Sequence, residues 1–249
     1  MENKILKKII NIFGYKLIEK KQVKNNRILS ENTKLKIETI LKSIFDKNDI
    51  KNVLQIGAND GISFDVLNHF IKKHKTKSIL VEPIKQNFLK LKDNYKNFEK
   101  IIFENSAIIC EENITYLYKV DEKYHNKYGN HIPAISSFDK NHIIKHGVKR
   151  SHIVKEKINS LTIKDLINKH SIIDLDLFFV DAEGYDGKIV YDLLTHSNLR
   201  PIIIFEYIHI ENEFFEKLID LISKKNFSYF NVSECIVLYP QEKKIEITF

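Results

Sequence analysis

The sequence predicts an α/β protein with a mostly parallel central sheet of about seven strands and helices on both faces. From residue 52 onwards, short apolar runs alternate with helix-like segments, and this alternation is typical of strand–helix–strand units. Several runs are apolar almost without interruption, such as "IIIFEY", which indicates strands that are buried on both faces. We therefore expect a parallel sheet enclosed between two layers of helices.

The predicted elements follow one another in chain order. Pro201 stands directly before the fifth apolar run, a position where proline can open a strand. The predicted helices of the main domain are 62–74, 84–96, 186–195 and 211–224. The predicted strands are "NVLQI" (52–56), "SILVE" (78–82), "KIIFEN" (100–105), "DLFFVD" (176–181) and "IIIFEY" (202–207), with "TYLYKV" (115–120) in a hairpin and "FSYFNV" (227–232) and "IEITF" (245–249) as closing strands.

Two further helices are predicted before the sheet begins. Residues 3–13, "NKILKKIINIF", place apolar residues on one helical face and lysines on the other. Residues 31–46 have a second helical pattern of apolar residues. We therefore expect an N-terminal appendage over 1–48 and a main domain over 49–249.

The positive charge of the chain is concentrated at its N-terminus. The formal net charge is +7, and residues 1–27 hold eight basic and two acidic residues, so 8 − 2 = +6 lies there and about +1 remains for 28–249. The near-neutral main domain does not support a nucleic-acid cleft, and we expect no nucleic-acid partner. A basic amphipathic segment over 1–27 favours peripheral contact with an anionic membrane surface; packing of its apolar face on the main domain is the alternative.

Cysteine usage and hydropathy indicate where the protein is located. Cys110 and Cys235 form no motif, which favours a reducing compartment over a disulfide framework. The sequence has no run of about 18 apolar residues and no signal-peptide pattern at its start. We expect a cytoplasmic protein, with the inner face of the membrane as a second location through residues 1–27.

A long polar segment interrupts the strand–helix alternation near 121–155. It shows neither helical nor strand periodicity, and it contains His125, His131, His142, His146 and His152, which are five of the ten histidines. The segment is too long for an ordinary connection. We expect an acceptor-side insertion that covers the site as a lid; a partly disordered insertion is the alternative.

The glycine-rich turn after the first strand indicates a nucleoside-binding site. "VLQIGANDG" places Gly57 and Gly61 in this turn, and Glu82 ends the second strand 82 − 61 = 21 residues later. A glycine turn lets a ligand approach the backbone, and an acid at this spacing accepts hydrogen bonds from ribose hydroxyls. The pattern G-x-G-x-x-G is absent. This weakens a nicotinamide dinucleotide interpretation and suits S-adenosylmethionine, which has a ribose but no pyrophosphate.

Six segments resemble the FkbM family of S-adenosylmethionine-dependent methyltransferases. They are "VLQIGANDGISFDVL", "ILVEPIKQNFLKLKDNY", "FENSAI", "INSLTIKDLI", "LFFVDAEGYDGKIV" and "PIIIFEY", in the family's order and spacing over roughly residues 50–210. The resemblance implies the class I Rossmann-like fold and S-adenosyl-L-methionine as the cofactor. Many members have an acid where this chain has Gln55.

The resemblance also assigns roles to single residues. The methionine and ribose end of the cofactor would be held by the first turn and by the end of the second strand, the adenine by the residues after the third strand, and the sulfonium and acceptor by those after the fourth. The predicted cofactor residues are Gly57, Ala58, Asn59, Gly61, Glu82, Pro83, Asn105, Ser106, Ala107 and Asp181.

The implied reaction is O-methylation of a hydroxyl on a sugar or glycan, as in surface-polysaccharide biosynthesis. A hydroxyl is a weak nucleophile, so a base should take its proton during attack. The predicted catalytic residues are Asp181, Glu183 and His131, with His152 and His209 as alternatives for the base. Asp181 and Glu183 with a loop histidine would suit a divalent metal, but no linear ligand spacing such as H-E-x-x-H occurs, and no metal is predicted.

Other functions remain open on the sequence. The same fold also serves nucleic-acid methyltransferases and methyltransferases of other small molecules, and a nicotinamide-dependent oxidoreductase shares its nucleoside-binding features. A protein that binds the cofactor but only scaffolds a partner is a non-enzymatic alternative.

Overall fold

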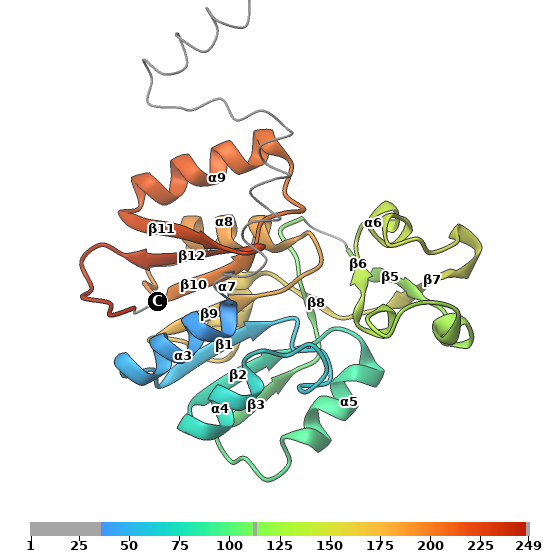
Figure 1. The fold of residues 1–249 in the computed structure, drawn as a ribbon, viewed down its shortest axis with the longest axis horizontal. Helices are drawn as coiled ribbons and strands as arrows, with labels where there is room; N and C mark the ends of the chain where they lie inside the picture. Colours follow the sequence, from blue (N-terminus) through green and yellow to red (C-terminus); the bar gives the residue numbers. More distant parts are fainter. Residues whose placement is uncertain (1–35, 112–113, 248–249) are drawn as a thin grey trace, which may run out of the picture. The chain divides into compact units, whose positions relative to one another are not determined.

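A seven-stranded sheet forms the centre of the protein, with the strand order β11-β12-β10-β9-β1-β2-β3 (Figure 1). The computed structural model describes residues 36–111 and 114–247. The predicted helix over 3–13 and the start of the one over 31–46 therefore lie outside the described residues. From residue 36 on, the chain forms one compact unit.

The sheet is parallel over five strands and ends in an antiparallel hairpin. β3, β2, β1, β9 and β10 run parallel, whereas β12 is antiparallel to both β10 and β11. The chain moves outwards from β1 through β2 to β3 and then returns to β9 on the other side of β1, so the strand order switches between β1 and β9. The strands are β1 (Asn52–Ile56), β2 (Lys77–Val81), β3 (Ile101–Glu104), β9 (Leu177–Val180), β10 (Ile202–Glu206), β11 (Phe227–Val232) and β12 (Cys235–Pro240).

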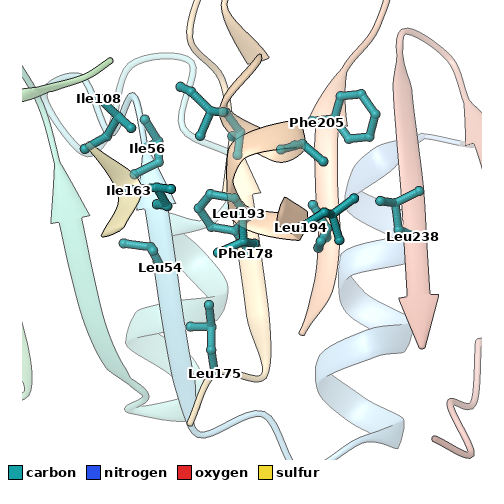
Figure 2. Close-up of a cluster of buried hydrophobic side chains, with 14 of the residues drawn as sticks. Leu54, Ile56, Ile108, Ile163, Leu175, Phe178, Leu193, Leu194, Phe205 and Leu238 are labelled. Carbon is teal, nitrogen blue, oxygen red and sulfur yellow. The ribbon is translucent and has the colours of Figure 1, made fainter. Parts of the chain in front are cut away.

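Helices cover the sheet, as the sequence predicts. Strand side chains alternate between the two faces, and one set packs with α7, α8 and α9 in the largest apolar core (Figure 2). Side chains of the opposite set, such as Val53, Leu80 and Leu177, are buried as well. None of the described helices is long and apolar enough to cross a membrane. The helices are α3 (Ile37–Lys47), α4 (Asn68–His74), α5 (Lys85–Asn94), α7 (Ile163–Lys169), α8 (Asp186–His196) and α9 (Asn212–Lys224).

The helix predicted over 62–74 is wrong in its first half, because α4 begins only at Asn68. Residues 62–67 form turns in which aspartate side chains accept hydrogen bonds from the backbone N–H groups. Asp60 Oδ1 accepts from Ile62 at 2.9 Å, and Asp65 Oδ1 accepts from Leu67 at 2.8 Å. Such local side-chain bonds compete with helical ones.

The closing strands differ from prediction at the C-terminus. β11 is the predicted "FSYFNV", but its partner is β12, "CIVLYP", after a tight turn at Ser233 with φ 54°. The predicted strand "IEITF" is wrong over 245–247, which have no regular structure. Two apolar runs separated by two residues are a hairpin signal, but this turn lacks the usual glycine.

The insertion is more regular than the sequence indicates. β5 (Tyr116–Val120) pairs with β6 (Ser136–Ser137) and β7 (Ile153–Lys157) in an antiparallel sheet, which confirms the predicted hairpin strand. Its apolar core contains Val120, Ile132, Ile135, Ile143, Val148 and Ile153. The remaining elements of this region are α6 (Lys140–Lys145), the 3-10 helices η1 (Glu122–Lys127), η2 (Ile132–Ala134) and η3 (Arg150–His152), and the pair β4 (Ala107–Ile108) and β8 (Ser160–Leu161).

Candidate functional site

A cavity of about 570 Å³ opens at the carboxyl ends of the parallel strands. Ile56 at the end of β1, Glu82 after β2, Asp181 after β9 and Glu206 at the end of β10 all line it. Ligands of open parallel sheets bind at this edge, beside the point where the strand order switches. The topology therefore places the cavity where the sequence predicts a ligand.

The two glycines of the first turn are required by the protein's own packing. A Cβ atom on Gly57, which has φ +80°, would lie 1.8 Å from the backbone oxygen of Asp181. A Cβ atom on Gly61 would lie 2.6 Å from Leu91 Cδ1 and 2.7 Å from Tyr95 Cε2. Gly57 thus allows the turn after β1 to approach the end of β9, while Gly61 allows it to pack on α5.

Glu82 links the first turn to the end of β2. Its carboxylate accepts hydrogen bonds from the backbone N–H groups of Asn59 at 2.9 Å and Ile84 at 2.8 Å. Burial raises the pKa of Glu82 to about 7. Asn105 supports the same segment, because its Nδ2 donates to the backbone oxygens of Glu82 and Pro83. Glu82 is therefore held in place by backbone and amide groups.

Gln55 and Asp65 present unpaired acceptors at the cavity. Gln55 Nε2 donates to Asp65 Oδ1 at 3.1 Å. The other oxygens, Gln55 Oε1 and Asp65 Oδ2, are buried without a hydrogen-bond partner among the described residues, and burial raises the pKa of Asp65. Both residues line the cavity. Buried polar atoms are normally paired, so these two acceptors are available to donor groups of a ligand.

The loop after β9 is held rigid by its own aspartate. Asp186 accepts hydrogen bonds from the backbone N–H groups of Ala182 at 3.0 Å and Gly184 at 3.1 Å, and burial raises its pKa to about 6. Between them, Glu183 has a left-handed backbone with φ 49°. Its backbone oxygen accepts from Ser137 Oγ of β6 at 3.0 Å. The strained Glu183 is therefore fixed from both the start of α8 and the insertion.

Carboxylates dominate the charge of the cavity. None of the described residues that line it is Lys or Arg. Desolvation raises the pKa of Asp181 well above its usual range, although its side chain is open to the cavity, and it raises the pKa of Glu206 to about 8. A bound cation would favour the ionised form of these groups. The acids lining the cavity are Asp65, Glu82, Asp181, Glu183, Glu206 and Glu234.

Histidines of the insertion meet the loop after β9. His142 Nε2 lies 2.9 Å from Glu183 Oε2 and 3.3 Å from His146 Nε2. One ligand atom from each of these three residues can be chosen so that all lie within 4.8 Å of one another, an arrangement that could hold a metal ion. The ring of His209, from the loop after β10, packs edge-on against His142 with centroids 4.7 Å apart.

The other insertion histidines have different surroundings. His131 lines the cavity, and its ring centroid lies 6.0 Å from that of His146. His152 stacks on Tyr124 with ring centroids 3.7 Å apart, and its Nδ1 lies 2.5 Å from the Tyr128 hydroxyl. His152 is thus part of the insertion's own packing and is not among the cavity residues.

Most predicted site residues come together at the cavity. Ala58, Gly61 and Asn105 are not among the lining residues, and Ala58 is fully buried. The others line it: Gly57, Asn59, Glu82, Pro83, Ser106, Ala107, His131, Asp181 and Glu183.

Several residues of the site were not among the predicted ones, including Gln55 and Glu206, which line the cavity. Asp65 and His146 line the cavity, and His142 contacts Glu183 beside it. For the two histidines the available signal was the spacing in "HIIKH", because residues four apart share one helical face. Asp65 follows the first turn in an irregular segment, where no periodic pattern marks it.

A second, more open cavity of about 720 Å³ adjoins the first. Phe138, Glu183 and His209 line both, whereas His142 lines only the second and His146 only the first. The cluster of His142, His146 and Glu183 therefore lies where the two cavities meet. This arrangement offers separate spaces for two ligands with a polar boundary between them.

Comparison with known proteins identifies a family. The model of the methyltransferase FkbM domain family matches residues 55–229. No curated protein sequence matches the chain.

Solved structures of several methyltransferases are distantly similar in fold. Precorrin-6y C5,15-methyltransferase from Geobacter metallireducens GS-15 is 10% identical, with 83% of this chain and 87% of that chain covered and a TM-score of 0.40. The METTL16 MTase domain is 11% identical, with 83% and 67% covered and a TM-score of 0.46. A TehB-like SAM-dependent methyltransferase from Corynebacterium glutamicum ATCC 13032 is 10% identical, with 88% and 94% covered and a TM-score of 0.40.

Proposed function

This chain belongs to the FkbM methyltransferase family, and we propose that it transfers the methyl group of S-adenosylmethionine to a hydroxyl of a neutral sugar or glycan. Family membership implies S-adenosylmethionine as the methyl donor. The acceptor class rests on the resemblance to family members that methylate glycans, often in surface-polysaccharide pathways. The charge of the first cavity supports the donor half of the proposal.

The observation that carries the proposal is a cavity lined by six carboxylates, with no Lys or Arg among its described lining residues. The methyl donor has a sulfonium and an ammonium group, and such cations are stabilised by nearby carboxylates. Phosphates would instead be repelled there. The charge pattern of this cavity therefore disfavours a dinucleotide pyrophosphate as the donor. The second cavity is lined by Lys145 and Lys188 as well as by acids, so the neutral acceptor rests on the family resemblance.

The residues that line the cavity fit the methyl donor. Glu82 can accept both ribose hydroxyls, because the hydrogen bonds that fix its buried carboxylate come from two backbone N–H groups and leave lone pairs free. The unpaired oxygens of Gln55 and Asp65 can accept from the ammonium group. Pro83 and Ala107 offer apolar surface to the adenine. When bound, S-adenosylmethionine supplies an electrophilic methyl group on a positively charged sulfur.

Asp181 is the base that we assign. It is open to the cavity, and desolvation raises its pKa well above the usual range, which makes the ionised carboxylate a stronger base than one with an ordinary pKa. Glu183 and His131, which the sequence also predicts as catalytic, line the same cavity. Alignment of acceptor and donor supplies the rest of the rate enhancement, since an in-line displacement depends mostly on geometry.

Calorimetric titration with S-adenosylmethionine and S-adenosylhomocysteine tests the donor half of this proposal. We expect binding by the native chain, much weaker binding by Glu82→Ala, and native binding by the exposed control Glu216→Ala. The acceptor half is tested by methyl transfer from labelled donor to panels of neutral glycans and of RNA. Absence of donor binding would overturn the function, while methylation of RNA alone would overturn the acceptor class.

We also propose that residues 1–27 bring the enzyme to an anionic membrane surface. Their net charge of +6 (8 − 2) matches the requirement of a basic interfacial segment. Substituting Gln for Lys4, Lys7 and Lys8 in the full chain should weaken sedimentation with phosphatidylserine vesicles and leave S-adenosylhomocysteine binding intact. Equal sedimentation of the native and substituted chains would contradict this location.

A further inference from the structure

The cluster of His142, His146 and Glu183 has the geometry of a metal site. His142 Nε2 lies 2.9 Å from Glu183 Oε2 and 3.3 Å from His146 Nε2, and one ligand atom from each residue lies within 4.8 Å of the others. Ligands about 2.0–2.1 Å from a tetrahedral zinc ion are about 3.3 Å apart. The three donor atoms thus need only small shifts to surround one ion.

We propose that His142, His146 and Glu183 bind one divalent transition-metal ion, with Zn²⁺ as the ion that this ligand set fits best. Two imidazoles and a carboxylate are a known zinc-binding combination, and imidazole favours zinc over magnesium or calcium. None of the three residues is among the predicted cofactor residues, although His146 and Glu183 line the same cavity.

Hydrogen bonding alone leaves the cluster incompletely satisfied. Each neutral imidazole has one N–H donor and one acceptor nitrogen. A proton on His142 Nε2 that points to Glu183 leaves His146 Nε2 facing the same N–H group, so one proton must serve two acceptors. A metal ion accepts a lone pair from all three groups at once.

Two parts of the fold position the ligands. His142 is in α6 and His146 caps its C-terminus, so their spacing of four residues places them on one face. Glu183 is in the loop after β9, where Ser137 and Asp186 restrain the backbone around it. A bound ion would therefore cross-link the insertion to the central sheet and fix the acceptor side relative to the donor side.

The three ligands would leave a coordination position for a fourth group. Catalytic zinc sites keep such a position, whereas structural ones are closed by four protein ligands. His146 lines the first cavity, His142 the second, and Glu183 both. On the basis of the proposed methyl transfer, the fourth ligand is the acceptor hydroxyl, whose pKa falls on metal binding so that Asp181 can take its proton more readily.

Zinc titration of the full chain after chelator treatment tests the site. We expect one Zn²⁺ per chain, with affinity at least about 10-fold weaker in His146→Gln and in Glu183→Gln. His146 is only partly buried, so His146→Gln should fold, which circular dichroism checks. His196→Gln is the matched control, because His196 also lies beside a carboxylate, that of Asp192 at 2.7 Å, but on the exposed surface of α8.

Thermal unfolding gives a second measurement. Zn²⁺ should raise the melting temperature of the native chain and of His196→Gln but not that of the double variant His142→Gln/His146→Gln. Equal zinc affinity in the native chain and in this double variant would overturn the site, as would the absence of stoichiometric binding by the native chain.

The outcome is separable from that of the proposed function. S-adenosylhomocysteine binding to the metal-free chain reports on the donor site alone, and zinc binding reports on the cluster alone. If the role at the acceptor holds, removal of the metal lowers methyl transfer and leaves S-adenosylhomocysteine affinity unchanged. Full methyl transfer by the metal-free chain would overturn that role.

Discussion

Glu82→Gln is the substitution that tests the donor site most directly. The Glu82 side chain is buried at 5% exposure and accepts two backbone N–H groups. Desolvation holds its pKa at about 7 in the absence of a ligand. Glutamine preserves the size of the side chain but lacks the charge, so the variant isolates what the carboxylate contributes to ribose binding.

The expected loss of S-adenosylhomocysteine affinity in Glu82→Gln, and its change with pH, follow from the charge and the pKa of Glu82. Hydrogen bonds to an ionised group contribute about 1.5–3 kcal/mol, so S-adenosylhomocysteine should bind the variant about 10- to 100-fold more weakly at pH 8. With a pKa of about 7, the ionised fraction of Glu82 rises from about one tenth at pH 6 to about nine tenths at pH 8. Because the ribose hydroxyls bind the ionised form, affinity should rise about tenfold over this range.

Isothermal titration at pH 6, 7 and 8 measures both effects. Repeating the titrations in two buffers of different ionisation enthalpy counts the protons that binding releases. The native chain should release nearly one more proton at pH 6 than the variant does, while Glu216→Gln should behave as the native chain. An unchanged affinity in Glu82→Gln at pH 8, or a native affinity that falls as the pH rises, would refute this role of Glu82.

Three further substitutions test the packing around the cavity. Gly57→Ala should abolish folding, because its Cβ would lie 1.8 Å from the Asp181 backbone oxygen. Gly147→Ala is the control, because Gly147 also has a positive φ of +81° but its Cβ would have no atom within 4 Å. This control should cost only about 1–2 kcal/mol in a urea titration. Glu206 has a pKa of about 8 in the folded protein, raised from 4.5. Below pH 4.5 the carboxyl is protonated in both the folded and the unfolded state, and its contribution to stability is fully present. That stability is lost as the pH rises through 8, because the buried group must then ionise. Glu206→Gln should therefore raise the free energy of unfolding by about 2–4 kcal/mol at pH 9 and hardly at pH 5; an equal effect at both values would contradict the raised pKa. Asp186→Ala should cost about 2–4 kcal/mol in the same titration because it removes two hydrogen bonds from backbone N–H groups to a carboxylate, and a cost below about 1 kcal/mol would show that water replaces the carboxylate.

The central sheet was predictable because its signals are local. Each parallel strand is a short apolar run, and the glycines and acids that follow it appear in the sequence beside the strand end that they serve. The sequence alone therefore places Glu82 and Asp181 at one edge of the sheet. The resemblance to a family then supplied the ligand that such an edge holds.

The acceptor side was not predictable by the same means, because its contacts are distant in sequence. Glu183 and His142 are 41 residues apart, and no periodic pattern brings α6 to the loop after β9. The insertion's strands are also short, with two residues in β6, so their alternation is too brief to detect. The long polar segment concealed a small core whose apolar residues are contributed by separate short strands and helices.

Gly57 shows how the two halves of the site depend on each other. The sequence favours a glycine that gives a ligand room, whereas the structure places the backbone oxygen of Asp181 in that space. The turn after β1 and the loop after β9 are thereby packed backbone against backbone, and Asp181 N–H donates to the Ile56 oxygen at 3.0 Å beside this contact. An in-line displacement requires the acceptor and the donor to be held within a few tenths of an ångström of their reactive separation. If the proposed methyl transfer holds, Gly57 fixes that separation through the backbone, and Gly57→Ala should abolish both the contact and the fold that depends on it.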